Sequence, residues 1–317
     1  MQMPAVREKV RFASGDSQCA AWHYPGTTGG CVVMAGGFAV TKEPATDQFA
    51  RRFSDAGLAV LAFDYRHLGE SGGQPRQVAP VGEQLADWHA ALGYAATLPG
   101  VDPARLAIWG FSASGGHVFR VAAGYPALAA AIAQTPNADG LAAGRNAARY
   151  QSPAALLRLA GRGLLDALGA LAGRPPRLVP LSGERGTVAV LTTPDSRDGG
   201  RALNPGGRYP DWRPEVAARS ALRLGWYRPG RAAARVRCPL LVLACDQDQS
   251  ALAGPAVAAA ARAPRGQLAR LPGGHYAPFL DAHDQAVEAE IAFLRAHLLE
   301  PAPPGRPDPA AAAAARA

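Results

Sequence analysis

Three residues far apart in the sequence have the types needed for nucleophilic catalysis by a serine: Ser112, Asp248 and His275. A serine hydroxyl is a poor nucleophile until a histidine removes its proton, and the histidine needs a carboxylate to hold its ring and stabilise the imidazolium. The order serine, acid, histidine is kept, and each residue follows a short apolar run that is typical of a buried strand. This order predicts a catalytic triad that attacks a carbonyl carbon and forms an acyl-enzyme.

Ser112 lies where an apolar run, residues 106–109, meets a glycine-rich segment and then a helical pattern. A tight strand-to-helix turn lifts a serine above the carboxyl edge of a parallel sheet, and it needs small residues two positions before and after the serine. Gly110 and Ser114 meet this need. A second frame, in which Ser114 is the nucleophile, also meets this need, because Ser112 and Gly116 then lie two positions before and after it. The apolar run ends at residue 109, which is too early for the second frame. A third interpretation is a turn that binds an anion through its amides.

Asp248 and His275 follow the last two predicted strands. The apolar run 239–244 leads to Asp248, and the strand 267–271 leads to a Gly-Gly-His turn whose glycines let His275 reach across the sheet edge. Asp246 competes with Asp248 for the acid role. We favour Asp248, because the nearer residue is expected to close the strand.

The rest of the chain alternates between strands and helices, and most strands are apolar throughout. Such runs are typical of strands buried on both faces. We therefore predict an α/β fold with a mostly parallel central sheet and helices on both of its faces. Strands are expected at residues 6–12, 18–24, 31–35, 58–63, 106–109, 128–133, 239–244 and 267–271, and helices at 44–56, 81–97, 255–262 and 284–299.

The character of the chain changes between residues 137 and 235, where Ala/Leu/Arg-rich helical patterns and turn-rich segments dominate. Insertions of this size between strands are usually caps over the loops that carry the chemistry. We predict a core at 1–136 and 236–299, a helical cap at 137–235, and a disordered Pro/Ala-rich tail at 300–317. The leucines of the cap, residues 137–235, would either line a hydrophobic acyl pocket or pack the cap onto the core.

A chain of 317 residues with a formal charge of +8 can form one large α/β domain. Scattered arginines supply the charge, which argues against binding to nucleic acid. No HExxH motif, CxxC pair, GxGxxG or P-loop occurs, so we expect no metal and no cofactor. Without an apolar leader or a membrane-spanning stretch, we expect a soluble cytoplasmic protein and leave homodimer formation open. The cysteines are expected to be reduced and buried: Cys19, Cys31, Cys238 and Cys245.

Taken together, the motifs resemble those of the capped α/β-hydrolase-fold enzymes, which include esterases, thioesterases, dienelactone-hydrolase-like enzymes and polyketide transferases. The resemblance covers nearly the whole chain up to residue 299. It implies Ser112 as nucleophile, Asp248 as acid, His275 as base, and the amides of Phe38 and Ala113 as the oxyanion hole. The segments that carry it are residues 36–38, 41–43, 63–73, 109–117 and 273–275.

Three functions fit this resemblance. The first is hydrolysis of a small-molecule ester or thioester, whose acyl group could be carrier-bound. The second is transfer of the acyl group to an acceptor other than water in natural-product biosynthesis. The third is a catalytically quiet protein that binds a ligand in the same fold.

One position departs from the family. Where its members usually have His-Gly-Phe-Gly, this chain has Gly36, Gly37, Phe38 and Ala39, so the histidine that braces the oxyanion loop is missing. Removing one oxyanion donor costs on the order of 3 kcal/mol in other serine enzymes. We therefore expect a loosened loop, with either low hydrolytic activity or adaptation to another reaction.

Overall fold

An eight-stranded sheet forms the centre of the structure, a computed structural model in which residues 7–299 are described. The sheet strands are β1 (Glu8–Ser14), β2 (Ser17–Tyr24), β3 (Cys31–Ala35), β4 (Ala59–Phe63), β5 (Leu106–Phe111), β6 (Ala130–Gln134), β9 (Leu240–Cys245) and β10 (Gly266–Leu271). Their order across the sheet is β1-β2-β4-β3-β5-β6-β9-β10. β1 and β2 form an antiparallel hairpin, β2 pairs antiparallel with β4, and all other neighbours are parallel. The mostly parallel sheet is confirmed.

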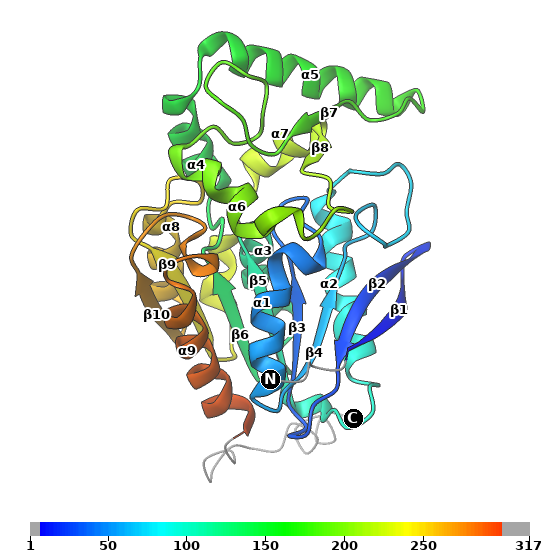
Figure 1. Ribbon diagram of the computed structural model, residues 1–317, viewed down its shortest axis with the longest axis vertical. Coiled ribbons are helices and arrows are strands. Elements are labelled where there is room, and N and C mark those ends of the chain that lie inside the picture. The colour runs from blue at the N-terminus through cyan, green and yellow to red at the C-terminus, as the bar shows by residue number, and fades with distance from the viewer. Residues whose placement is uncertain (1–6, 300–317) are drawn as a thin grey trace.

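Helices cover both faces of this sheet (Figure 1). One face packs against α1 (Lys42–Asp55) and α9 (His283–Leu294), which continues as a π-helical turn, Arg295–Leu299. The other face packs against α2 (Val81–Ala95), α3 (Ala113–Gly124) and α8 (Ala253–Arg262). Each strand contributes side chains to both faces of the sheet, because successive side chains of a strand point to opposite faces. The core therefore consists of two apolar layers, one on each side of the sheet.

The bounds of the strands differ from the expected ones by no more than two residues, and the expected start at residue 6 lies outside the described residues. Helix α1 begins at Lys42, earlier than the periodicity predicts. The reason is a contact from another segment: the backbone N–H of Lys42 donates to Asp64 Oδ1 at 2.7 Å. A carboxylate on a first-turn N–H stabilises a helix start.

Lys42 is itself buried, with a relative exposure of 1%. Its Nζ lies 2.9 Å from Asp64 Oδ2 and 2.7 Å from Glu70 Oε2. The N–H of Glu70 also donates to Asp64. This cluster ties the start of α1 to the loop that follows β4.

Substituting Lys42→Met should destabilise the protein, because it leaves the buried carboxylate of Asp64 without its cation. We expect the free energy of unfolding, measured by urea denaturation, to fall by about 3–5 kcal/mol. The double variant Lys42→Met/Asp64→Asn should recover part of that loss, since it removes the uncompensated charge. A Lys42→Met variant as stable as the native protein would show that the ion pair between Lys42 and Asp64 does not contribute to stability.

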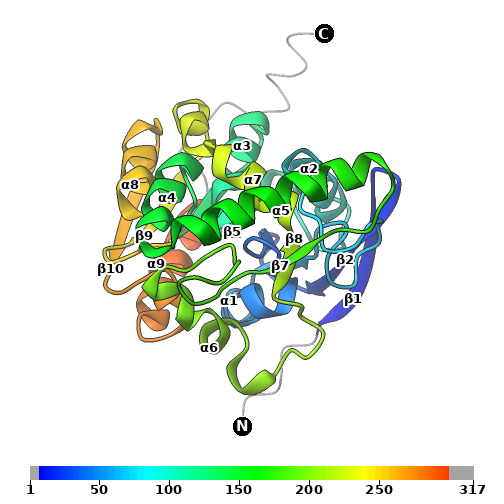
Figure 2. The same ribbon diagram turned by 90° about the horizontal axis from the view of Figure 1, so that it is seen from above.

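Residues 137–235, called the insertion below, leave the sheet after β6 and return to it at β9. Figure 1 shows most of the insertion above the sheet, and Figure 2, from above, shows its longest helix crossing the molecule. The division into core and cap remains a prediction, and the predicted disordered tail at 300–317 lies outside the described residues. The insertion contains α4 (Gly140–Ala147), α5 (Pro153–Leu171), β7 (Leu178–Pro180), η3 (Pro194–Asp198), α6 (Gly199–Leu203), β8 (Glu215–Ala217) and α7 (Ala218–Trp226).

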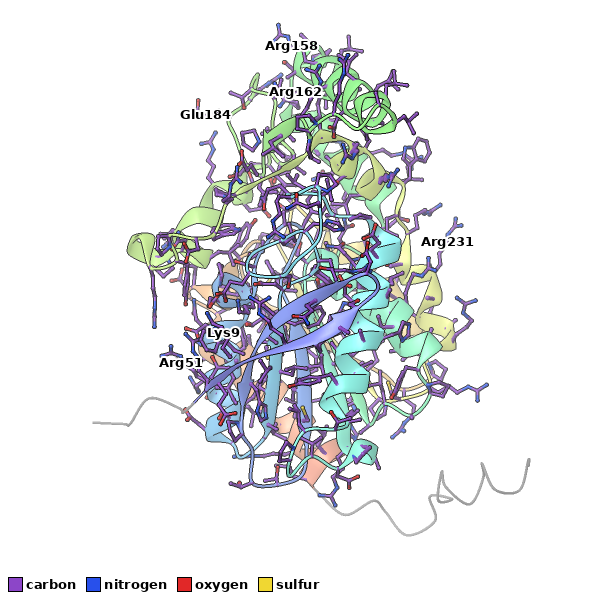
Figure 3. The ribbon with its side chains drawn as sticks, turned by 90° about the vertical axis from the view of Figure 1, so that its right-hand side faces the viewer. Lys9, Arg51, Arg158, Arg162, Glu184 and Arg231 are labelled. Carbon is purple, nitrogen blue, oxygen red and sulfur yellow. The ribbon has the colours of Figure 1, made fainter. Side chains whose placement is uncertain are left out.

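The exposed side of α5 is mostly apolar, although it also carries Arg158 and Arg162. Leu157 and Leu171 at its two ends are 74% and 87% exposed, and three leucines between them are also exposed. Figure 3 shows Arg158 and Arg162 projecting from the same helix. The exposed leucines of α5 therefore do not pack the insertion onto the core, although Leu159 of the same helix does. Other leucines of the insertion, Leu181, Leu191 and Leu203, lie in the space above Ser112, as expected for an acyl pocket. No helix in the described part of the chain is long and apolar enough to cross a bilayer.

Candidate active site

Ser112 lies at the tight turn between β5 and α3, with φ 56° and ψ −114°. A non-glycine residue adopts a positive φ only where the surrounding structure holds it. Gly110 shows why the turn needs a small residue: a Cβ there would lie 2.4 Å from the carbonyl oxygen of Ser114. The chain thus bends sharply at Ser112.

The side chains of Ser112, His275 and Asp248 form a hydrogen-bonded chain at the carboxyl edge of the sheet. His275 Nε2 lies 2.9 Å from Ser112 Oγ, and His275 Nδ1 lies 2.8 Å from Asp248 Oδ2. A carboxylate only accepts hydrogen bonds, so Nδ1 carries the ring proton and Nε2 accepts from the serine hydroxyl. Both His275 and Asp248 are buried. This arrangement can transfer a proton from the serine as it attacks.

Asp248, rather than Asp246, faces the histidine. Its second oxygen, Oδ1, accepts the N–H groups of Ser250 at 2.9 Å and Ala251 at 2.7 Å, so the carboxylate is held at both oxygens. Asp246 instead forms an ion pair with Arg270 in which both side chains are exposed. The structure therefore places Asp248, the favoured acid, against His275 and leaves Asp246 outside this contact.

The charge environment of His275 contains a second carboxylate. Burial alone would lower the pKa of His275, but Asp248 and Asp195 outweigh that effect and raise the pKa above the ordinary value of 6.5. Asp195 lies on η3 of the insertion and was missed by sequence reasoning. Nothing in its turn-rich segment distinguishes it from its neighbour Asp198.

The loop after β3 approaches the nucleophile closely. A Cβ on Gly37 would lie 3.3 Å from Ser112 Cβ. A glycine at this position therefore lets the loop approach the serine without crowding it. Phe38 follows and lines the same cavity as Ser112. Ala113 is the first residue of α3, and the first N–H groups of a helix have no partner within it. The two predicted oxyanion donors therefore both border the serine.

A buried hydrogen-bonded chain holds this loop from behind. Trp88 Nε1 donates to Tyr65 Oη at 2.8 Å, Tyr65 Oη lies 2.5 Å from Ser114 Oγ, and Ser114 donates to the carbonyl oxygen of Gly36. A Cβ on Gly36 would lie 2.6 Å from the carbonyl oxygen of Val40, so this loop has no room for a histidine. The loop therefore has a side-chain anchor in Ser114, the serine of the second frame, and the expectation of a loosened loop stays a prediction.

The sequence matches the model of the alpha/beta hydrolase family over residues 26–290. The chain belongs to the α/β-hydrolase family.

This α/β-hydrolase is similar to two curated proteins of different activities. It is 37% identical over 298 residues to the quorum-quenching protein AidA of Acinetobacter baumannii, spanning 92% of this chain and 96% of that protein. It is 35% identical over 183 residues to the polyketide transferase ATR5 of Stachybotrys chlorohalonatus, spanning 57% and 59%. The crystal structure of the α/β-hydrolase GrgF from Penicillium has a TM-score of 0.76 at 20% identity, over 92% of this chain and 99% of that one. At that identity the likeness shows the fold alone.

In this α/β-hydrolase, Ser112 opens into a cavity of about 410 Å³. Of the described residues that line it, none is charged. Both the core and the insertion contribute, so residues 137–235 help to enclose the space above the serine. Its larger apolar side chains are Phe38, Val40, Phe111, Leu181, Val190, Leu191, Leu203, Trp212 and Tyr276.

Proposed function

We propose that this chain is a serine hydrolase that cleaves a neutral, apolar ester or thioester through an acyl-enzyme on Ser112. The observation that carries the proposal is the hydrogen-bonded chain from Ser112 through His275 to Asp248, which borders an apolar cavity. Perturbed titratable groups beside a nucleophile in a concave site are typical of catalytic centres.

In the proposed mechanism, His275 Nε2 takes the hydroxyl proton as Ser112 Oγ attacks the carbonyl carbon. The N–H groups of Phe38 and Ala113 donate to the tetrahedral oxyanion. His275 then returns the proton to the leaving alkoxide or thiolate, and the acyl group stays on the serine. Water attacks in the second half, with His275 as base again, and releases the acid. Asp248 keeps the ring oriented in both halves.

The lining of the cavity supports a substrate with an apolar acyl group. A charged acyl chain would lose its hydration there without gaining a partner. One relative, which matches over nearly its whole length, is named for quorum quenching, and a hydrolase can interrupt a chemical signal by breaking a bond in it. A lactone with an apolar acyl chain is one such ester, and it belongs in the first substrate panel. We also propose that the insertion acts as a cap, because it supplies Leu181, Leu203 and Trp212 to the cavity.

Acyl transfer is the second candidate, and the similarity to a polyketide transferase favours it. Both reactions share the acyl-enzyme and differ only in the acceptor. Product analysis with added alcohols, amines and thiols distinguishes them. An acyl group that reaches the added nucleophile in preference to water indicates a transferase.

The deciding experiment is treatment with a fluorophosphonate, followed by peptide mapping. The proposal predicts a label on Ser112 that is lost in the His275→Ala variant. Hydrolysis of p-nitrophenyl esters of increasing chain length then tests the apolar pocket. A label on Ser114 would overturn the assignment of the nucleophile, and a folded protein that takes no label would favour the quiet ligand-binding hypothesis.

The brace behind the oxyanion loop gives a separate prediction. Ser114→Ala removes the hydroxyl that donates to the Gly36 carbonyl, without creating a clash. Complete loss of an oxyanion donor costs about 10²- to 10³-fold in kcat, so a loosened donor should cost about 10- to 100-fold, with KM little changed. Steady-state kinetics measure both constants, and unchanged kcat would show that the loop needs no brace.

A further inference from the structure

One carboxylate of the insertion contacts both loops that carry the proposed acid and base. Oδ2 of Asp195 accepts the backbone N–H groups of Gln249 at 2.8 Å, Ser250 at 3.2 Å and His275 at 3.2 Å. Its other oxygen, Oδ1, accepts from the hydroxyl of Ser250 at 2.8 Å. Four donors from two separate loops therefore converge on a single side chain.

These contacts lie directly beside the triad. Gln249 and Ser250 follow Asp248, and the N–H of Ser250 also donates to Asp248 Oδ1. On the other loop, a Cβ on Gly274 would lie 2.9 Å from Asp195 Cβ, so the histidine loop passes close to this residue. The position of the acid relative to the base thus depends on a residue about 50 to 80 positions away in sequence.

The carboxylate is also electrically coupled to the base. Burial would raise the pKa of Asp195, but His275 and the surrounding hydrogen-bond donors outweigh burial and lower it. Asp195 is therefore ionised at neutral pH. Its negative charge in turn contributes to the raised pKa of His275.

We propose that Asp195 is a positioning residue of the insertion: it holds the acid loop and the histidine loop together, and its charge stabilises the imidazolium that forms on His275. The inference rests on the proposed triad and adds to it a link between the insertion and the catalytic loops. Small displacements of catalytic groups cost large factors in rate, and a charge beside an imidazolium shifts its titration.

Few other groups can account for the titration of His275. Asp248 faces its Nδ1 from the loop after β9, and Ser112 faces its Nε2 from the start of α3. The ring of Tyr276 packs against the imidazole, and burial raises the pKa of that phenol, which keeps it neutral. Phe111 supplies an uncharged ring on β5. Asp195 is therefore the second carboxylate that acts on the base.

The charge and the hydrogen bonds of Asp195 can be tested separately. In Asp195→Asn, the amide oxygen can accept the same three N–H groups, and the amide NH₂ can donate to Ser250 Oγ. The Ser250 hydroxyl can then turn to Thr193 Oγ1, which lies 2.7 Å away. Asp195→Ala removes both the charge and the hydrogen bonds. Asp198→Asn, on the same turn, is the matched control, because Asp198 pairs with the exposed Arg201.

The base must be neutral to accept a proton, so kcat/KM falls as pH drops through the pKa of His275. Removing a nearby negative charge lowers that pKa, and the acid limb of Asp195→Asn should move to lower pH. Asp195→Ala should in addition lose about 10- to 100-fold in kcat, with a smaller change in KM. Asp198→Asn should match the native protein in both respects.

The inference is overturned if the acid limb of Asp195→Asn coincides with that of the native enzyme, or if Asp195→Ala keeps native kcat. NMR titration of the His275 ring, assigned against the His275→Gln variant, measures the same shift in the resting protein without a substrate. A failure of the proposed function would show as an unlabelled Ser112. In that case the NMR titration still decides whether Asp195 acts on His275.

Discussion

Replacing Ser112 by alanine should lower kcat/KM for ester hydrolysis by about 10⁴- to 10⁶-fold, as the loss of a triad nucleophile does in other serine enzymes. The reason is chemical, because Ser112 Oγ is the hydroxyl that lies within hydrogen-bond distance of His275 Nε2. Ser114 Oγ, the nearest alternative in sequence, donates to the Gly36 carbonyl and contacts Tyr65 instead of the histidine. The measurement is initial-rate hydrolysis of a short p-nitrophenyl ester at saturating and limiting concentrations.

The control for this experiment is the neighbouring serine. Ser114→Ala should keep the fluorophosphonate label on Ser112 although it turns over more slowly, whereas Ser112→Ala should lose the label and keep the melting temperature. Activity in Ser112→Ala above about one per cent of native would mean that another group attacks the ester, since a triad nucleophile accounts for far more of the rate.

Asp248→Asn should have the second largest effect, a fall of about 10⁴-fold in kcat. The N–H groups of Ser250 and Ala251 donate to Asp248 Oδ1, so the amide oxygen of the variant should stay there and its NH₂ should face His275. The ring nitrogen Nδ1 must then accept, which leaves the proton on Nε2. A ring in that tautomer cannot take the proton of Ser112.

The matched control is Asp246→Asn on the same loop. Asp246 forms an exposed ion pair with Arg270, and pairs of that kind contribute about 1 kcal/mol or less. Since Asp246 contacts Arg270 and not His275, we expect its kcat within about threefold of native, which corresponds to less than about 1 kcal/mol of activation free energy. Equal losses in the two aspartate variants, measured by steady-state kinetics, would contradict the assignment of Asp248 as the acid.

The sequence predicts the parts of this protein that depend on local pattern. The sheet could be predicted because its central strands are apolar on both faces. The strand-to-helix turn at Ser112 and the order of Ser112, Asp248 and His275 identified the site residues that the structure brings within hydrogen-bonding distance. The loop glycines were also informative, since a Cβ on Gly110 would collide with the carbonyl oxygen of Ser114 and a Cβ on Gly37 would crowd Ser112.

Contacts between distant segments could not be predicted. Asp195 is one acidic residue in a polar turn, and only the folded chain shows that it reaches Gln249 and His275. The leucines of α5 have a helical period that predicts an apolar face but cannot say whether another part of the chain covers it. The start of α1 at Lys42 likewise depends on Asp64, which lies in the loop after β4.

The brace behind the oxyanion loop has a consequence for recognising and redesigning such proteins. Position 114 and position 36 are linked, because the hydroxyl of Ser114 donates to the carbonyl oxygen of Gly36, and a Cβ at position 36 would collide with the carbonyl oxygen of Val40 in the same loop. The two positions should therefore change together during evolution. Grafting the usual histidine onto Gly36 alone would displace the loop, so an engineer who wants the common motif has to exchange both positions and reshape the turn between them.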